Sequence, residues 1–476
     1  MTSEATIASA SGVRFASINP ADPRDVVGSF ATATAADVTT AIGEAEAAHA
    51  EWSQTPPSRR APLVAAVAHA IARETAELVE LITREEGKTL AESRVEVQKS
   101  VEQFNFASQL AYQLEGTTFP DEEASTFTYT VRVPLGVVVA ITPWNFPLSL
   151  PARKIAPAIA AGNAVVFKPS PATAGVGAAL VRICEEAGLP RGLVRLVQGD
   201  DPDAMSALVS DSRVRAVTFT GSDRVGELLH RTVRAGTRLQ FELGGHNIVV
   251  VCADADLDSA ADLVVRGATG LAGQACTATD RVLVERPVYG AFRDLVAAAM
   301  TTIRVGPGAV AGVSCGPVAT AAQHERLERL RASALGAGAE IVGEALLSDG
   351  LERSSGYFVT PTAFAAVDEQ HPLAAGEVFG PYFSIAPIGG VDEGLAAVND
   401  DEHGLVTAIH TSSLATAGRF SRDARCGIVK VNRRTTGNGV APPFGGWKRS
   451  SSGAFPEGGR QALDFFTDTK TVYTGL

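Results

Sequence analysis

The chain has 476 residues, too many for one hydrophobic core, and its 45% apolar and 20% charged residues are ordinary values for a globular protein. The formal net charge of −12 gives an acidic surface, and no stretch collects lysine and arginine into a stripe, so we expect no nucleic-acid partner. No apolar run approaches the ~20 residues of a membrane span, and Met1–Ser11 lacks the basic and apolar regions of a signal peptide.

Helical periodicity dominates the first part of the chain. Apolar side chains recur at three- and four-residue spacing through Ala61–Ile82, between breaks at Pro56-Pro57 and Gly87, so residues 34–115 are expected to be helical. The stretch Thr126–Val133 differs, because β-branched and aromatic residues alternate there with period two. That pattern predicts a strand.

From residue 137 onward the pattern becomes an alternation of strands and helices. The short apolar runs that predict strands are Val137–Ile141, Ala164–Lys168, Leu193–Val197, Ala216–Thr220 and Ile248–Val251. Helical segments between most of these runs indicate a parallel sheet covered by helices.

A second alternating series follows residue 276. Its expected elements are the strand Arg281–Glu285, the helices Val288–Ile303 and Glu325–Leu335, the strand Glu340–Val342 and a final β-rich segment, Asp464–Val472. We predict two βα domains and a small strand element.

The five cysteines are scattered, odd in number and without a CxxC pair: Cys184, Cys252, Cys276, Cys315 and Cys426. Neither a disulfide framework nor a metal site is expected, and reduced thiols indicate the cytoplasm. A buried, inert thiol is the usual interpretation of any single cysteine. Cys276 differs, because the small residues around it in GQACT keep its sulfur accessible as a nucleophile.

Three further segments suggest chemistry, although each alone has an ordinary structural interpretation. Residues 142–147, Thr-Pro-Trp-Asn-Phe-Pro, form a rigid loop after an apolar strand, where ligands of open α/β sheets bind. Residues 219–226 carry Gly221 and Gly226 at a strand–helix turn that suits a pyrophosphate, without the full G-x-G-x-x-G pattern. Glu242 ends a strand between apolar neighbours, where partial desolvation would raise its pKa toward that of a general base.

Together these segments indicate covalent carbonyl chemistry: a cysteine nucleophile, a glutamate base, an asparagine amide for an oxyanion and a nucleotide-type turn for hydride transfer. At these residues the chain resembles the aldehyde dehydrogenase superfamily, from INPAD at residue 18 to KTVY at residue 470. The motifs, in the order typical of the family, are TPWNFP (142–147), KPS (168–170), FTGS (219–222), ELGG (242–245), GQACT (273–277), EVFGP (377–381) and PFGGWK (443–448).

The resemblance implies roles for individual residues. Cys276 would attack the aldehyde carbon, while Asn145 and the Cys276 backbone amide hold the oxyanion of a thiohemiacetal that loses hydride to the nicotinamide. Glu242 would activate the water that hydrolyses the thioester, which argues against the CoA-acylating branch, and Lys154 would support the site. The implied cofactor contacts are Glu377 and Phe379 for the nicotinamide riboside, Lys168 for the adenosine ribose, Ser222 for the pyrophosphate, and also Ile141, Thr142, Pro143, Trp144, Ser170, Pro171, Gly221, Val225 and Leu243.

The choice between NAD and NADP stays open. Pro171 stands where many NAD-preferring relatives carry a glutamate that grips both ribose hydroxyls, so a 2′-phosphate would not be repelled and NADP is favoured. Asp200 and Asp201 oppose this, because they follow Gly199 near the expected adenine end.

Within the superfamily the chain is similar to the semialdehyde branch, which includes α-ketoglutaric and succinate-semialdehyde dehydrogenases. Arg153 stands where succinate-semialdehyde enzymes bind the substrate carboxylate, and a guanidinium suits that role. A surface or interdomain arginine is the alternative. Gly270 stands where those enzymes often place a second arginine, which leaves room for a neutral or aromatic aldehyde.

The resemblance implies an α/β fold with a Rossmann-type cofactor domain (1–117 and 136–245), an α/β catalytic domain (246–445) and a small β oligomerisation element (118–135 and 446–476). Open strand edges in that element predict a homodimer or homotetramer. The alternatives from other classes are a non-catalytic protein and a thiol esterase on the same fold. The expected partner is a small-molecule aldehyde.

Overall fold

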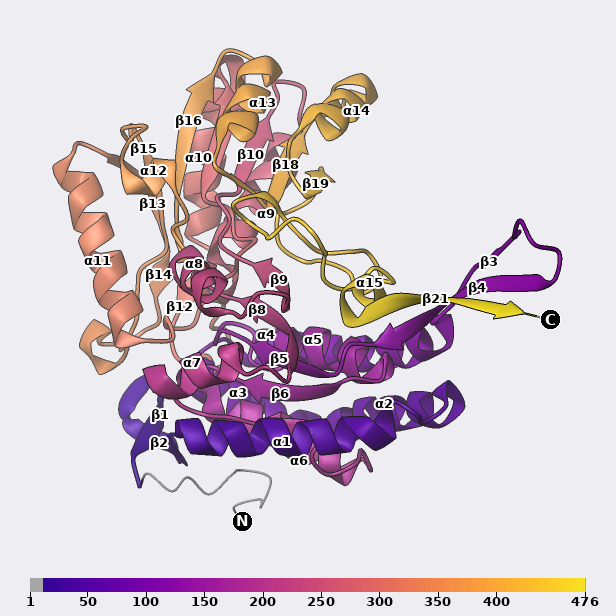
Figure 1. Cartoon of the computed structure of the whole chain (residues 1–476). Helices are drawn as coiled ribbons and strands as arrows, with labels where there is room; N and C mark the ends of the chain where they lie inside the picture. Colours follow the sequence, from indigo (N-terminus) through magenta and orange to yellow (C-terminus); the bar gives the residue numbers. More distant parts are fainter. Residues whose placement is uncertain (1–11, 476) are drawn as a thin grey trace.

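The computed structural model describes residues 12–475, so the expectation for Met1–Ser11 lies outside the described residues. Two sheets, each flanked by helices, form the body of the molecule, and a smaller sheet extends from it (Figure 1). One hydrophobic core packs on the first large sheet, and two separate cores pack on the second. The exact domain boundaries given above remain predictions. Within residues 12–475, no helix is both long enough and apolar enough to cross a membrane.

The first large sheet is five-stranded, in the order β7-β6-β5-β8-β9. Its strands are β5 (Val137–Ile141), β6 (Ala164–Lys168), β7 (Val194–Leu196), β8 (Val214–Thr220) and β9 (Arg238–Glu242). All neighbours run parallel, and Ile141 at the end of β5 pairs with Lys168 of β6 and with Phe219 of β8. The carboxyl ends of the strands therefore meet at one edge, where open α/β sheets bind ligands.

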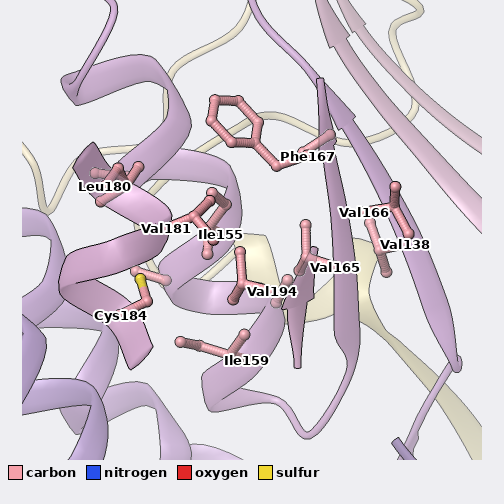
Figure 2. Packing of buried hydrophobic residues seen from close by; sticks show 14 of the residues in the cluster. Val138, Ile155, Ile159, Val165, Val166, Phe167, Leu180, Val181, Cys184 and Val194 are labelled. Atoms are coloured by element: carbon pink, nitrogen blue, oxygen red, sulfur yellow. The ribbon is translucent and has the colours of Figure 1, made fainter. Parts of the chain in front are cut away.

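Helices pack around this sheet: α1 (Ala35–Trp52), α2 (Pro57–Arg73), α3 (Thr75–Glu86), α4 (Leu90–Leu110), α5 (Ser149–Ala160), α6 (Ala174–Glu186), α7 (Pro202–Ser210) and α8 (Asp223–Thr232). Figure 2 shows Ile155 of α5 and Val181 and Cys184 of α6 packed toward Val165 and Val194 of the sheet. Burial raises the pKa of Cys184 to about 12, so this cysteine is an inert core residue.

The second large sheet is seven-stranded, in the order β13-β15-β16-β11-β10-β18-β19. Its strands are β10 (Ile248–Val251), β11 (Arg281–Glu285), β13 (Glu340–Glu344), β15 (Thr362–Ala365), β16 (Tyr382–Ile388), β18 (Val406–His410) and β19 (Ile428–Val431). All pairs are parallel except β13 with β15. The accompanying helices are α9 (Leu257–Thr269), α10 (Tyr289–Met300), α11 (Ala321–Gly336), α12 (Pro372–Ala375), α13 (Val391–Asp400) and α14 (Leu414–Asp423).

The small sheet is antiparallel, in the order β21-β4-β3, and projects from the body beside the C-terminus (Figure 1). It contains β3 (Thr118–Phe119), β4 (Thr126–Pro134) and β21 (Thr467–Gly475), which follows α15 (Ala462–Phe466). The prediction of β structure from Asp464 was therefore wrong for its first residues. Ala462, Leu463, Phe465 and Phe466 are all buried in the first core, a helical spacing that period-two alternation would not allow.

The sequence analysis did not identify the antiparallel pair of β1 (Arg14–Asn19) and β2 (Asp22–Ala31). Two shorter pairs join β12 (Arg304–Val305) to β14 (Leu346–Leu347) and β17 (His403–Gly404) to β20 (Trp447–Lys448). Short 3-10 turns complete the elements: η1 (Ala111–Gln113), η2 (Pro171–Thr173), η3 (Gly270–Gly273), η4 (Arg286–Val288) and η5 (Arg353–Ser355). The other predicted strands and helices are confirmed, with ends that differ by a few residues.

Candidate active site

Asn145 lies in the loop that leaves the central strand β5. The loop is tied to the neighbouring strand by the Thr142 backbone N–H, which donates to the Lys168 carbonyl at 3.2 Å. Asn145 is 2% exposed, and its Nδ2 donates to the Gln274 carbonyl at 2.8 Å. Because Nδ2 carries two protons, one is left for a substrate oxygen beside the loop that carries Cys276.

Cys276 follows a turn with an unusual backbone. Leu271, Ala272 and Gly273 all have positive φ, at 55°, 50° and 67°, a conformation that non-glycine residues adopt at a cost. Asn247 Nδ2 donates to the Cys276 carbonyl at 2.9 Å and fixes the residue from the other side. The half-buried Cys276 is thus held by backbone contacts.

The electrostatic surroundings of Cys276 favour the thiol. Burial, together with the carboxylates of Glu377 and Glu242, raises its pKa to about 12. Cys276 itself is only half-buried, so part of the residue can be reached from outside. The reacting thiolate is a minor species near neutral pH in the protein alone.

Glu242, at the end of β9, is 2% exposed. Ser451 Oγ donates to Glu242 Oε1 at 3.3 Å. Burial raises the pKa of Glu242 well above its usual value, and the negative charge of Glu457 acts in the same direction. The expected desolvated carboxylate is present.

Lys154, on α5, forms a buried ion pair with Glu457 and donates to Thr218 Oγ1 at 2.9 Å. The sequence analysis missed Glu457. Its only local signal is a lone carboxylate between Pro456 and two glycines, which no motif connected with Glu242.

Motifs far apart in the chain meet around the segment 242–245. A Cβ added to Gly244 would lie 2.6 Å from Glu377 Oε2, and one added to Gly245 would lie 2.7 Å from the Cys276 carbonyl oxygen. The Gly245 N–H donates to Glu377 Oε1 at 3.2 Å. Only glycine leaves room for these approaches. A Cβ added to Gly445, in the PFGGWK motif, would lie 3.2 Å from Glu242 Oε1.

The predicted cofactor residues follow the carboxyl edge of the first sheet. The Trp144 and Phe379 rings meet edge to face, with centroids 5.6 Å apart, and Ile141, Val225 and Leu243 pack on the first core. Pro143 precedes Trp144 in the same loop, and Gly221 directly follows β8.

The same edge fits a dinucleotide. Ser222 starts α8, is exposed, and makes no side-chain cap, so the first turn of the helix is open to a phosphate. Lys168 has no ion pair among the described residues; burial lowers its pKa, and nearby Asp200 acts in the opposite direction. Ser170 Oγ accepts from the Ala172 N–H at 3.3 Å and so fixes the turn that contains Pro171.

Arg153, on α5, lies over the Phe444 ring with its guanidinium carbon 4.6 Å from the ring centroid. Its charge lowers the pKa of Cys276 and of Glu242, against larger opposing effects. It forms no ion pair within residues 12–475. The arginine is therefore a free cation close to the reacting groups.

The aldehyde dehydrogenase family model matches residues 7–472. This chain belongs to the aldehyde dehydrogenase family. It is 39% identical over 469 residues to the 2,5-dioxopentanoate dehydrogenase of Saccharolobus solfataricus, covering 98% of this chain and 97% of the relative. It is 38% identical over 456 residues to the α-ketoglutarate semialdehyde dehydrogenase of Haloferax volcanii, covering 96% and 94%.

Solved structures of other aldehyde dehydrogenases share the fold. Betaine aldehyde dehydrogenase from Staphylococcus aureus, crystallised with NAD⁺, is 29% identical with a TM-score of 0.94, covering 98% of this chain and 92% of that one. An NADP-dependent enzyme from Escherichia coli is 29% identical with a TM-score of 0.93, covering 98% and 96%. The predicted α/β fold and the predicted family are confirmed, and the enzyme is an NAD(P)-dependent aldehyde dehydrogenase that acts on a small-molecule aldehyde.

Proposed function

We propose that this aldehyde dehydrogenase oxidises a semialdehyde that carries a carboxylate, and that Arg153 binds this carboxylate. The observation that carries the proposal is the free guanidinium of Arg153, close enough to Cys276 to act on its pKa. A carboxylate paired with a guanidinium at a fixed distance from the aldehyde would orient the substrate. The two relatives described above are named for semialdehyde or dioxo-acid substrates, which supports the same class.

Two lysines extend the positive charge beyond Arg153, because the charge of Arg153 acts on Lys99 and that of Lys99 acts on Lys430. Lys99 of α4 donates to the Asn438 carbonyl, and its pKa is lowered by burial and by Arg153. Lys430 of β19 has its pKa lowered to about 8 by burial and by the positive charges of Arg434 and others nearby. Neither lysine forms an ion pair in the described part of the chain. Such a group of unpaired cations would attract an anionic substrate.

In the proposed reaction the Cys276 thiolate forms a bond to the aldehyde carbon, and the aldehyde oxygen takes up the negative charge. Asn145 Nδ2 and the Cys276 backbone N–H donate to that oxygen. A bound oxidised nicotinamide dinucleotide would accept the hydride, the hydrogen with its two bonding electrons, that leaves the substrate carbon. Glu242 then takes a proton from the water that attacks the resulting thioester, and cleavage of the carbon–sulfur bond releases the carboxylic acid and the Cys276 sulfur.

The preferred cofactor is proposed to be NADP. Pro171 offers no carboxylate to the adenosine ribose. Lys168, the last residue of β6, would supply a cation for a 2′-phosphate. Asp200 is the opposing feature, because its charge acts on Lys168. Asp201 instead caps α7, where its Oδ1 accepts from the Ala204 N–H at 2.8 Å, so its carboxylate is held at the start of that helix.

We propose a homodimer or homotetramer built on the projecting sheet β21-β4-β3. Phe119, Phe127 and Tyr473 of this sheet are 47%, 45% and 70% exposed, and long strands with apolar side chains are usually covered by another subunit. We also propose the cytoplasm as the compartment, since the five cysteines are free thiols in separate parts of the chain.

An uncharged aromatic aldehyde is the second candidate. The observation in its favour is Gly270, where an added Cβ would meet nothing within 4 Å. Because glycine replaces the second arginine of the semialdehyde enzymes, the space that this side chain would fill is open. The deciding experiment compares kcat/KM for straight-chain semialdehydes, the neutral aldehydes of equal length and benzaldehyde, each with NAD and with NADP. A preference for the semialdehydes supports the proposal, and a preference for benzaldehyde supports the alternative.

A further inference from the structure

The segment that begins α4 lies against both loops of the candidate active site. Thr89 caps the helix in a capping box with Glu92, so the side chains of this first turn are fixed in direction. Lys88 and Glu96 are almost completely buried. None of these residues was assigned a role in the candidate active site above. Lys88, Glu92 and Glu96 nevertheless contact the loops that carry Asn145 and Cys276, and Thr89 contacts Glu92.

Lys88 holds the loop of Asn145 by its backbone. Its Nζ donates to the Asn145 carbonyl at 2.6 Å and pairs with Glu96 at 2.5 Å. The ammonium also lies 4.7 Å from the centroid of the Phe146 ring, a cation–π contact. Burial alone would lower the pKa of Lys88, and the carboxylates of Glu86 and Glu96 raise it instead. The charged Lys88 thus holds the loop that carries the Asn145 amide, and we call its hydrogen bond to the Asn145 carbonyl the tether.

Glu96 holds the same loop three and four residues after Asn145. Its second oxygen, Oε1, accepts the backbone N–H of Leu148 at 2.9 Å and that of Ser149 at 3.1 Å. These amides lie at the start of α5, where N–H groups lack partners inside the helix. One buried ion pair therefore fixes both the carbonyl of Asn145 and the amides that follow it.

Glu92 holds the other loop. Its Oε1 accepts the Leu271 N–H at 2.7 Å, while Oε2 completes the capping box. Leu271 and Ala272 are the non-glycine residues with positive φ on the approach to Cys276. Such backbone persists only where its surroundings impose it, and Glu92 supplies a charged acceptor at that point.

We propose that Lys88, Glu92 and Glu96 are positioning residues that set the Asn145 amide and the Cys276 loop relative to each other. The two loops also touch directly, through Asn145 Nδ2 and the Gln274 carbonyl. An oxyanion donor acts only at the right place, so its support on a helix outside the site determines how much of its effect is realised. The kinetic part of this inference rests on the role of Asn145 in the proposed function.

A double-mutant cycle tests the tether. Asn145→Ala should lower kcat by roughly 10²–10³-fold if the amide holds the oxyanion, and Lys88→Met should lower it about tenfold because the amide is misplaced. In the Asn145→Ala background, Lys88→Met should cost less than about twofold, since no amide is left to position. Cofactor affinity should stay unchanged. Equal losses in both backgrounds would overturn the tether.

Lys88→Met also leaves the buried carboxylates of Glu86 and Glu96 without their cation, which could lower kcat in another way. A second experiment therefore measures the structure of the Cys276 loop directly. Glu92→Ala should speed hydrogen exchange in peptides that contain Leu271, and lower kcat by about tenfold. Glu92→Gln keeps one acceptor oxygen, enough for either the Leu271 N–H or the Thr89 N–H, so both measurements should lie between those of Glu92→Ala and of the wild type. Unchanged exchange at Leu271 in Glu92→Ala would show that Glu92 does not hold the Cys276 loop.

The matched control is Asp37→Ala. Asp37 completes the same type of capping box with Thr34 on α1, so its loss should destabilise the fold similarly without changing exchange at Leu271. If Asn145→Ala retains the wild-type rate, the proposed oxyanion role of Asn145 fails. Exchange at Leu271 then still decides whether Glu92 holds the Cys276 loop.

Discussion

Lys154 and Glu457 form a buried ion pair beside the catalytic glutamate candidate, although they lie far apart in the chain. Their side chains are 0% and 2% exposed. Glu457 raises the pKa of Glu242, and Lys154 lowers it. The pair therefore sets the pH range in which Glu242 can accept a proton.

Glu457→Gln should shift the acidic limb of the kcat–pH profile to lower pH. Removing the negative charge lowers the pKa of Glu242, and the released Lys154 charge acts in the same direction, so the ionised base persists at lower pH. Breaking a buried pair also destabilises the fold, by about 3–5 kcal/mol, so melting temperature is measured in parallel. The exposed Glu186→Gln serves as control. A shift to higher pH would contradict the assignment.

Glu242→Gln should slow steady-state turnover by ~10²-fold or more, the range for loss of a general base. Because water activation follows oxidation, a pre-steady-state burst of NAD(P)H should survive. Stopped-flow absorbance checks both phases. Normal turnover would transfer the base to another carboxylate, with Glu377 the next candidate.

Cys276 should react with iodoacetamide at a rate that rises with pH up to the pKa of about 12. Burial raises the pKa of Glu377 to about 8, so this group acts as a carboxylate only above that pH. Glu377→Gln should therefore speed the reaction at a fixed pH between about 8 and the thiol pKa, since removing the carboxylate lowers the thiol pKa and enlarges the thiolate fraction. The exposed Glu369→Gln is the matched control, and Cys276→Ala gives the background labelling. A slower reaction in Glu377→Gln would show that this carboxylate does not act on the sulfur.

Pro171→Glu should move the preference toward NAD. The new carboxylate would bond ribose hydroxyls and repel a 2′-phosphate. The measurement is the ratio of kcat/KM for NADP and NAD, with Pro190→Glu as a control far from the cofactor edge. An unchanged ratio would place selectivity elsewhere, with Asp200 the first residue to examine.

Arg153→Leu should remove most of the advantage of semialdehydes over neutral aldehydes of equal length. Charged hydrogen bonds to a bound carboxylate contribute about 1.5–3 kcal/mol, roughly ten- to a hundredfold in kcat/KM. Neutral aldehydes should be almost unaffected. Arg266→Leu, which removes an exposed arginine of α9, is the control. A uniform loss across all aldehydes would instead assign Arg153 to support of α5 and Phe444.

Much of the fold and of the candidate site could be predicted because the signals are local. The strands Val137–Ile141 and Ile248–Val251 are apolar runs bounded by turns, and the structure gives them the predicted ends. Asn145 follows β5 and Glu242 ends β9, and residues at the carboxyl ends of strands gather at one edge of a parallel sheet. Cys276 precedes β11 of the other sheet, so its association with them was predicted from the family resemblance alone.

What only the tertiary structure decided depends on packing between distant segments. Phe465 and Phe466 form a helical turn because the first core takes both rings, whereas the local composition favours a strand. Glu457 acts on Glu242, and Lys88 holds Asn145, because packing brings segments from different parts of the chain into contact. A carboxylate's pKa and an amide's position are properties of what surrounds them, so the amino-acid sequence determined the chemistry available to this enzyme, and the fold determined how it is held.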